Sequence, residues 1–474
     1  MATLRKVLVA NRGEIAVRVI RACREEGIRA VAVASDADMD SLAVREADEV
    51  VGIGPATATS SYLNVGAIVG AALLAGCDAV HPGYGFLSEQ PELVEACDRF
   101  GLTFVGPSAD TIRAAGDKLE ARQLARDLGV PLAAGTEAVS DPERVAELVA
   151  ELGLPVLIKA AAGGGGRGMR LVRGISELAG AVERARAEAL AAFGDDRLYV
   201  ERYVEQARHV EVQILGDTHG TIVHLGDRDC SYQRRYQKVA EEAPASAIPD
   251  NLRASLWEAA RTLMGALGYV GAGTVEFLVD VQRGTFAFLE INTRVQVEHP
   301  VTEMITGLDI VREQLRIAAG EPLSFGQDDV VLNGHALEFR VNAESPERGF
   351  LPTPGLIEAW DAPSGPGIRV DTHCFAGYTV PAHYDSLLAK LVVWAQDRPS
   401  ALARAEAALA DFRVTGVETT LGLHRALIQH PDVRENSVST RWLEETFLPS
   451  WSQDEGEGRP NGLAPAVTER NPNR

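Results

Sequence analysis

The chain has 474 residues, of which 46% are hydrophobic and 24% charged, which is typical of a globular protein with room for about two to four domains. Its formal net charge of −21 disfavours a nucleic-acid partner held through phosphates and a general attraction to anionic membranes. Its 5 cysteines form no CxxC pair, which argues against a disulfide framework or a zinc site and fits a reducing cytoplasm.

Residues 1–115 alternate between strand and helix patterns. Apolar runs at 6–10 and 30–35 predict strands, and the helical spacing of 13–27 predicts a helix between them. The alternation continues through residues 67–106. We therefore expect an α/β fold that begins with a doubly wound, mostly parallel sheet. The turn after the first strand reads ANRGE rather than GxGxxG, so NAD binding is a weak interpretation.

The rest of the chain divides into four expected parts and a tail. The N-terminus lacks the apolar stretch of a secretory signal, and residues 65–80 are too short and too rich in Gly and Ala to span a membrane, so we expect a cytoplasmic protein without membrane contact. The expected parts are a connecting helix at 116–131, a small glycine-rich unit at 132–203, a strand-rich unit at 204–330, an α+β C-terminal unit at 331–447, and a polar tail at 448–474 that we expect to be disordered.

A glycine-rich turn at residues 163–166 lies between two strand-like segments, 156–160 and 169–173. Such a turn lets backbone N–H groups close over phosphates without interference from side chains, and Lys159 is placed to reach a phosphate oxygen. The segment is not a Walker A loop, because no GK[ST] follows and the next element is a strand. The alternative is a flexible linker.

Residues 274–280 and 285–291 are both rich in Val, Phe and Thr, and Gly284 between them predicts a hairpin. With the hairpin centred near Arg283, Glu276 falls directly opposite Glu290, so their Cβ atoms would be roughly 5 Å apart. Asn292 would follow on the same face. Two carboxylates and an amide oxygen suit Mg²⁺ or Mn²⁺. The alternatives are a register shifted by one residue, or carboxylates turned into water.

The segment 289–300, LEINTRVQVEHP, places polar residues at every second position. A strand would direct all of them to one face, which predicts a functional row rather than an ordinary solvated face. Pro300 would then end strand pairing. The alternating residues are Glu290, Asn292, Arg294, Gln296 and Glu298.

Three further segments carry candidate residues. His209, Glu211 and Gln213 alternate along one predicted strand face, although a single His is more often structural. Residues 227–244 mix basic and acidic residues without an amphipathic period, which predicts a loop that is either solvated or closes over an anion through Lys238. In the predicted strand 335–343, Arg340 lies on a polar face.

The ordered series of these motifs resembles the ATP-grasp enzymes, and among them the biotin carboxylases. The likeness runs from about residue 4 to residue 447. The matching stretches are ANRGEIA, HPGYGFLSE, GDK, IKAAAGGGGRGM, RHVEVQ, RDCSYQRRYQK, GAGTVEF, EINTRVQVEHPVTE, GHALEFRVNAE and LPTPG.

The resemblance implies an ATP-grasp lid at 132–203, a catalytic half at 204–330 and a C-terminal biotin carboxylase domain at 331–447. Residues implied to contact ATP are Lys118, Lys159, Gly165, Gly166, the stretch Glu201, Arg202, Tyr203 and Val204 at the adenine, His209 and Gln233. The implied Mg²⁺ or Mn²⁺ ligands are Glu276, Glu290 and Asn292. Lys238, Arg294 and the backbone of Val297 would hold bicarbonate, Glu298 would be its base, and Arg340 would face biotin.

The implied reaction begins when Glu298 takes the proton of bicarbonate, whose oxygen attacks the γ-phosphate of ATP and gives carboxyphosphate. Carboxylation of biotin follows, as the first half-reaction of an acetyl-CoA or other acyl-CoA carboxylase, for example in fatty acid biosynthesis. None of the 5 methionines adjoins a lysine, so we expect biotin to arrive on a separate biotinylated carrier protein that also serves a carboxyltransferase. The resemblance also implies a homodimer.

Two other functions are compatible with parts of this pattern. Another ATP-grasp ligase, which joins a carboxylate to an amine, would share the lid and the metal ligands. A non-catalytic nucleotide-binding subunit should have lost a metal ligand or the base. The sequence departs from the family at Tyr236, where relatives commonly have His, and at Arg202, where Lys is frequent.

Overall fold

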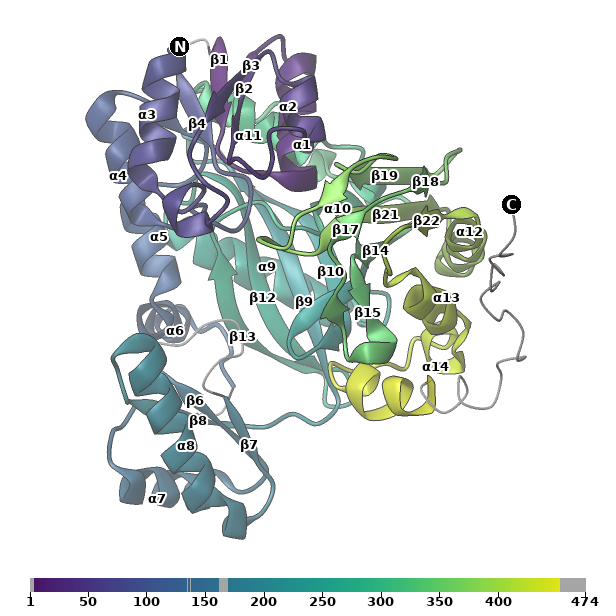
Figure 1. Ribbon diagram of the computed structural model, residues 1–474. Coiled ribbons are helices and arrows are strands. Elements are labelled where there is room, and N and C mark those ends of the chain that lie inside the picture. The colour runs from purple at the N-terminus through teal and green to yellow at the C-terminus, as the bar shows by residue number, and fades with distance from the viewer. Residues whose placement is uncertain (1–3, 134, 137, 162–168, 452–474) are drawn as a thin grey trace, which may run out of the picture.

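The computed structural model describes residues 4–133, 135–136, 138–161 and 169–451. Figure 1 shows a main body built on two sheets and a smaller unit that stands apart from it at the lower left. Among the described residues, no helix is both long and apolar enough to cross a bilayer.

The N-terminal unit is a five-stranded, fully parallel sheet in the order β3-β2-β1-β4-β5. This confirms the doubly wound expectation, and the strand order reverses direction at β1, so the loops after β1 and β4 form a switch point where ligands bind in such folds. The strands are β1 (Lys6–Val9), β2 (Arg29–Ala34), β3 (Glu49–Gly52), β4 (Ala79–His81) and β5 (Thr103–Phe104). The helices are α1 (Gly13–Glu25), α2 (Leu42–Glu46), α3 (Val65–Ala75), α4 (Pro91–Phe100) and α5 (Ala109–Gly116), with a 3₁₀ turn at Ala58–Ser60.

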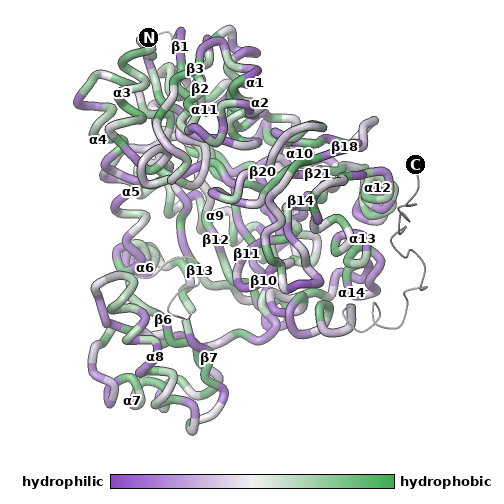
Figure 2. Tube along the Cα trace, in the orientation of Figure 1, coloured by the Kyte–Doolittle hydropathy of each residue, from purple (hydrophilic) through white to green (hydrophobic). Residues whose placement is uncertain are grey.

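The smaller unit contains a three-stranded antiparallel sheet, β7-β6-β8, covered by two helices. It spans the predicted lid, and β6 and β7 pair as expected on either side of the glycine-rich turn, which itself lies outside the described residues. In Figure 2 both lid helices carry hydrophobic and hydrophilic stretches, as expected for helices with one face on a sheet. The elements are α7 (Pro142–Leu152), β6 (Val156–Ala160), β7 (Arg170–Val172), α8 (Ile175–Phe193) and β8 (Leu198–Arg202), and α6 (Lys118–Asp127) connects the unit to the N-terminal sheet.

An eight-stranded antiparallel sheet in the order β13-β12-β9-β10-β11-β14-β21-β19 forms the centre of the main body. It runs across the expected boundary at residue 330, because β11 pairs with β14. Its strands are β9 (Ala207–Gly216), β10 (Ile222–Arg234), β11 (Gln237–Ala243), β12 (Gly271–Asp280), β13 (Thr285–Asn292), β14 (His335–Asn342), β19 (Ile368–Thr372) and β21 (Leu387–Ala395).

Apolar side chains on opposite faces of this sheet pack against different helices. Val212 and Ile214 on β9 share a core with α9 (Asp250–Ala266), and this leaves His209 and Glu211 on the other face. On β14, Leu337 and Phe339 share a core with α12 (Arg398–Asp411). The short helix α10 (His299–Thr306) packs against β10, β11, β14 and β21, where Val301 and Ile305 meet Ala336.

The remaining elements complete the C-terminal unit and its contacts. The helices are α11 (Ile310–Ala318), α13 (Leu421–Gln429), α14 (Pro431–Arg434), 3₁₀ turns at Gln327–Asp329 and Pro346–Arg348, and a π-helical segment at Leu443–Phe447. The short strands are β15 (Glu344–Ser345), β16 (Leu351–Pro352), β17 (Gly355–Leu356), β18 (Ala359–Asp361), β20 (Thr379–Val380) and β22 (Arg413–Thr415).

Three sequence-based expectations were wrong in part. The polar row does not continue as one strand, because β13 ends at Asn292, a turn follows, and α10 begins at His299. Residues 227–244 are not a loop but lie largely in β10 and β11, joined by a tight turn. Residues 448–451 are helical rather than disordered, and the rest of the expected tail lies outside the described residues.

Candidate active site

A cavity of about 640 Å³ lies where the switch-point loops of the N-terminal unit meet the polar face of the large sheet. The loops after β1 and β4 contribute residues 11–15 and 84–86, and residues 383–387 close the other side. Many of the predicted site residues line this cavity: His209, Lys238, Glu276, Glu290, Asn292, Arg294, Val297, Glu298 and Arg340.

Lys238 is the central cation of the cavity. It extends from β11, and its Nζ atom lies 2.6 Å from Glu211, 3.1 Å from Glu276 and 2.5 Å from Glu298. Burial alone would lower the pKa of Lys238, but Cys230 and the three carboxylates raise it well above its usual value. The amine is therefore held in its charged form, and one cation contacts carboxylates from three separate segments.

Glu298 occupies the turn before α10 and is almost completely buried. Its second oxygen accepts a hydrogen bond of 3.0 Å from Nη2 of Arg340. Burial alone would raise the pKa of this carboxyl, but Lys238, Arg340 and Arg228 hold it well below the usual range. Glu298 is thus ionised and able to accept a proton.

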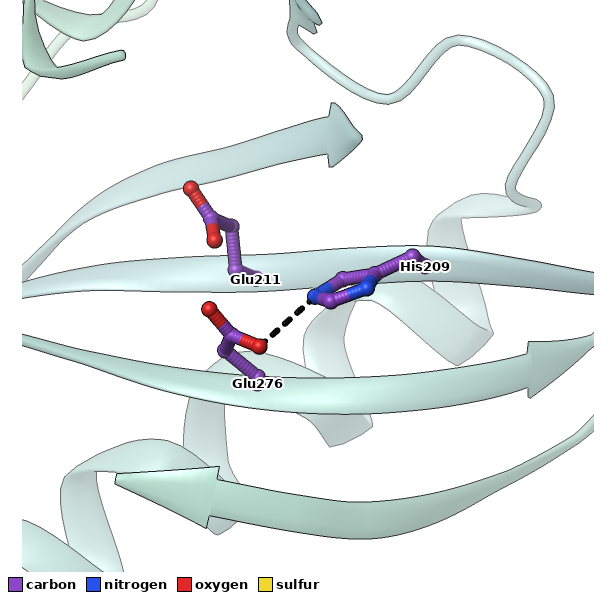
Figure 3. A group of neighbouring side chains, drawn as sticks. All are labelled: His209, Glu211 and Glu276. Atoms are coloured by element: carbon purple, nitrogen blue, oxygen red, sulfur yellow. Dashed lines mark ion pairs between the residues drawn. The ribbon is translucent and has the colours of Figure 1, made fainter. Parts of the chain in front are cut away.

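The predicted hairpin has the predicted register, because Glu276 on β12 pairs directly with Glu290 on β13. Glu276 lies 2.8 Å from Nε2 of His209 and accepts a hydrogen bond of 3.0 Å from Asn292. Figure 3 shows the imidazole of His209 turned toward Glu276, with Glu211 beside them. The side chain of Glu290 is 39% exposed and lies 3.5 Å from Lys118. Oxygen donors on adjacent strands, one of them open to the cavity, fit a hard divalent cation.

The histidine in this group is influenced by its carboxylate neighbour. Burial would lower the pKa of His209, but Glu276 raises it above its usual value. Nδ1 of the same ring lies 2.8 Å from Nε2 of Gln233. The amide of Gln233 and the carboxylate of Glu276 therefore fix the ring between them.

Arg294 is fixed by a residue that the sequence analysis did not select. Its Nε donates to Glu89 over 2.9 Å, and the other oxygen of Glu89 accepts from the backbone N–H of Thr293 over 3.1 Å. Glu89 follows β4 and lies 205 positions away from Arg294 in the chain. The N-terminal unit thus orients a cation that lines the cavity.

Three family models match the chain in succession. They are the biotin carboxylase N-terminal domain at residues 3–112, the ATP-binding domain of the carbamoyl-phosphate synthase L chain at residues 117–325, and the biotin carboxylase C-terminal domain at residues 338–445. The chain belongs to the biotin carboxylase family.

Curated relatives and solved structures extend the likeness over almost the whole chain. Biotin carboxylase 1 of Bacillus subtilis is 47% identical over 442 residues, which cover 93% of this chain and 98% of the relative. Biotin carboxylase of Pseudomonas aeruginosa is 50% identical over 444 residues, with the same coverage. The structure of a biotin carboxylase complex from Campylobacter jejuni has a TM-score of 0.90 and 44% identity, covering 93% of this chain and 98% of that one.

A second solved structure is the biotin carboxylase domain dimer of the Hydrogenobacter thermophilus 2-oxoglutarate carboxylase, in complex with MgADP, ADP and bicarbonate. It has a TM-score of 0.89 and 45% identity, and the match covers 94% of this chain and 98% of that one. The likeness therefore includes a family member seen with nucleotide, metal and bicarbonate.

The residues expected to contact ATP lie around the junction of the lid and the main body. Lys159 on β6 and Arg122 on α6 both pair with Glu201 on β8, whose side chain is buried. Burial alone would raise the pKa of Glu201, but these two cations lower it. In this arrangement Lys159 is engaged with a carboxylate, and the Glu201 side chain is engaged with two cations.

The other members of this set have different surroundings. Arg202 turns outward and donates to the carbonyl of Leu152 over 2.8 Å. Tyr203 donates its backbone N–H to Pro155 over 3.0 Å, and Val204 is half-buried. Gly165 and Gly166 lie outside the described residues.

A buried ion pair next to Lys238, between Arg228 and Glu211, was not predicted from the sequence. Arg228 on β10 is fully buried and donates to Glu211 over 2.5 Å, to Gln213 over 2.7 Å and to Thr302 over 2.9 Å. The alternation of Glu211 with His209 was visible in the sequence, but the buried arginine on a neighbouring strand was not. Arg228 and Lys238 both form ion pairs with Glu211 and hold its carboxylate in place.

Proposed function

We propose that this chain carboxylates biotin on a separate carrier protein, with the charged residues of the cavity in the roles described below. The chain is an ATP-dependent ligase, and its substrates are ATP with Mg²⁺, bicarbonate and biotin. The contact that best supports the assigned roles is that of Lys238 with both Glu276 and Glu298, because it joins the metal-binding end of the site to the base.

The first step is activation of bicarbonate. Lys238, Arg294 and the backbone of Val297 would hold the anion, and Glu298 would accept its proton. The bicarbonate oxygen then attacks the γ-phosphorus, the bond from that phosphorus to the bridging oxygen breaks, and ADP leaves with the electron pair. Bound divalent metal, held by Glu276, Glu290 and Asn292, would supply charge neutralisation at the phosphates.

The nucleotide is held by a different set of residues. Lys118 and Lys159 would leave their carboxylate partners and bind phosphate oxygens instead. The glycines at 165 and 166 would cover the phosphates. His209 and Gln233, already in contact with each other, would hydrogen-bond the nucleotide. The stretch Glu201–Val204 would line the adenine through its backbone. Closure of the lid would exclude water from the carboxyphosphate.

The second step transfers the carboxyl group. Carboxyphosphate breaks its C–O bond to give CO₂ and phosphate, and the phosphate takes the proton from the biotin nitrogen. Arg340 would stabilise the negative charge that develops on the ureido oxygen, since it lines the cavity next to Glu298. The deprotonated nitrogen then attacks CO₂, and the product is carboxybiotin.

The partners proposed for this reaction are a biotinylated carrier protein and a carboxyltransferase subunit, as in an acyl-CoA carboxylase. A homodimer is proposed because a solved relative is a biotin carboxylase domain dimer. A cytoplasmic location is proposed from the reduced, unpaired state expected of the five cysteines, all of which are buried and free.

The test is an assay with purified chain, ATP, Mg²⁺, labelled bicarbonate and either free biotin or a biotinylated carrier. We expect labelled carboxybiotin, and Arg340→Ser should depress its formation far more than it depresses bicarbonate-dependent ATP cleavage. Cleavage that requires an amine acceptor instead of bicarbonate would indicate a carboxylate–amine ligase. Binding of ATP without any cleavage would indicate a non-catalytic subunit.

A further inference from the structure

Two buried glutamates lie directly opposite each other beneath Arg340. Glu241 on β11 and Glu338 on β14 are partners in the antiparallel register, and both are completely inaccessible to solvent. Cβ atoms of such partners are roughly 5 Å apart, so the two carboxyl groups can meet directly or through one water molecule. Their neighbours Ala240 and Phe339 belong to the core on the other face, which leaves the glutamates on the face covered by α10.

The two carboxyl groups differ in their partners. Oε1 of Glu241 accepts a hydrogen bond of 2.6 Å from Nε of Arg340. The other oxygen of Glu241 and both oxygens of Glu338 are buried and have no hydrogen-bond partner among the described residues. Buried carboxylate oxygens are almost always paired, because an unpaired charge inside a protein is costly. A shared proton resolves this, since a protonated Glu338 can donate to the unpaired oxygen of Glu241.

The surrounding charges do not remove the need for that proton. Lys390 on β21 is fully buried near Glu338, but its Nζ atom donates to the carbonyl of Val297 over 2.9 Å and lies 3.1 Å from Glu14. Burial raises the pKa of Glu338 well above its usual value, and Glu241 and Glu298 add to the rise, although Lys390 and Arg340 oppose it. Burial likewise raises the pKa of Glu241 to about 7, although Arg340 opposes the rise. The charged and titratable groups that interact with the pair are Cys230, Lys238, Glu298, Arg340 and Lys390.

We propose that Glu241 and Glu338 hold one proton between them and act as positioning residues for Arg340, with Glu241 as the anion that fixes the guanidinium and Glu338 as its neutral partner. This inference rests on the proposed role of Arg340 toward biotin. It assigns neither glutamate a contact with substrate.

The geometry of Arg340 shows what the pair accomplishes. Its contacts with Glu241 and Glu298 use Nε and Nη2. Among the described residues, Nη1 has no hydrogen-bond acceptor, so it is the donor left for a ligand in the cavity. A single negative charge on the Glu241–Glu338 pair holds the guanidinium of Arg340 in place and leaves part of its positive charge available to a ligand. A second charge would draw Arg340 toward the sheet and would repel the anionic Glu298.

The experiment compares two reactions across pH: carboxylation of free biotin, and bicarbonate-dependent ATP cleavage without biotin. Glu241→Gln should lower kcat/KM for biotin by roughly 10- to 100-fold, because a charged hydrogen bond to Arg340 is lost, and should change ATP cleavage by less than about twofold. In the unsubstituted protein, carboxylation should decline at alkaline pH as the pair loses its proton. Glu338→Gln should move that decline to higher pH, because an amide has no such proton.

The matched control is Glu242→Gln. Glu242 is the next residue on β11 and is also fully buried, but it pairs with His335 and Arg398, away from Arg340. The Glu242→Gln substitution should leave the ratio of biotin carboxylation to bicarbonate-dependent ATP cleavage unchanged. An unfolding midpoint measured for each variant identifies general destabilisation.

Two results would overturn the proposal. One is an alkaline decline in Glu338→Gln that coincides with that of the unsubstituted protein. The other is an equal loss of both reactions in Glu241→Gln. An equal loss of both reactions in Arg340→Ser would instead refute the assigned role of Arg340 toward biotin, which makes the two failures distinguishable.

Discussion

Replacement of Lys238 by Met is the most informative test of the charge arrangement in the cavity. The substitution keeps most of the side-chain length but removes the amine that contacts Glu211, Glu276 and Glu298 at 2.5 to 3.1 Å. These carboxylates are buried, so they would face one another without their shared cation. We expect the folded variant to take up at least one proton that the unsubstituted protein does not bind.

The magnitude follows from the contact distances. Two unit charges about 4 Å apart interact by about 4 kcal/mol at the effective dielectric of roughly 20 that suits protein sites. The cost of removing Lys238 from water offsets part of its summed attraction to the three carboxylates. Breaking a buried ion pair typically costs about 3–5 kcal/mol. Since one pKa unit corresponds to about 1.4 kcal/mol, this loss would raise the carboxylate pKa values by about 2–4 units in total.

The sign of the pH dependence distinguishes this explanation from a simple packing defect. In the unsubstituted protein the pKa of Glu298 is lowered, so its contribution to stability is present above the unfolded pKa and is lost as pH falls through the folded pKa. Without Lys238, burial keeps a carboxyl pKa raised, and the variant loses stability as pH rises above about 4.5. The stability difference between the two proteins should therefore grow with pH, by up to about 1.4 kcal/mol per pH unit for each proton.

Urea denaturation followed by tryptophan fluorescence between about pH 5 and pH 8 measures this difference. Lys6→Met is the matched control, because Lys6 pairs with Glu49 over 2.9 Å at a partly exposed position away from the cavity. The loss of unfolding free energy in Lys6→Met should stay near 0–1 kcal/mol, and it should depend on pH only at acid pH. A stability difference for Lys238→Met that is constant over this range would refute the inference that Lys238 neutralises the buried carboxylates.

Three further predictions concern the metal, bicarbonate and biotin. Glu276→Gln and Glu290→Gln should each raise the Mg²⁺ concentration needed for half-maximal ATP cleavage by about tenfold or more, and unchanged metal dependence in either variant would contradict a shared cation. Glu89→Gln should raise KM for bicarbonate by about tenfold through its lost contact with Arg294, whereas an increase confined to KM for ATP would contradict this role. An avidin blot of the purified chain should be negative while a biotinylated carrier stimulates turnover, and a strong signal on the chain would contradict a separate carrier.

The hairpin and the pairing of Glu276 with Glu290 were predicted from local information, namely the turn residues and the strand period. In the structure the turn pairs Asp280 with Thr285 and Phe277 with Phe288, and an irregularity next to Glu276 shifts the register by one residue and brings Glu276 opposite Glu290. Glu298 was expected near the site for a reason that proved wrong, since no strand extends to it. A turn after Asn292 brings it back toward the sheet, where Lys238 contacts it across 60 positions of sequence.

The failure at residues 227–244 has a different physical cause. The strand signal that we used assumes one polar and one apolar face, but most of β10 is buried on both sides. Asp227, Arg228 and Asp229 are fully buried and satisfied by partners on other elements. Sequence alone gives no sign of those partners, so the charges resemble a solvated loop. The contact of Glu89 with Arg294 could not be predicted either, because it joins residues 205 positions apart in the chain.

A lowered pKa would make Glu298 a weak base if the surrounding charges stayed as they are. Two of the cations that lower it, however, Lys238 and Arg340, are groups assigned to the substrates. When bicarbonate binds Lys238 and Arg294, these cations pair with the substrate and stabilise the carboxylate of Glu298 less. The added negative charge of bicarbonate also raises the pKa of Glu298. Arg340, once engaged with biotin, would act in the same direction. The base would thus become stronger as the anions that it must act on enter the cavity, and proton transfer would be coupled to substrate binding.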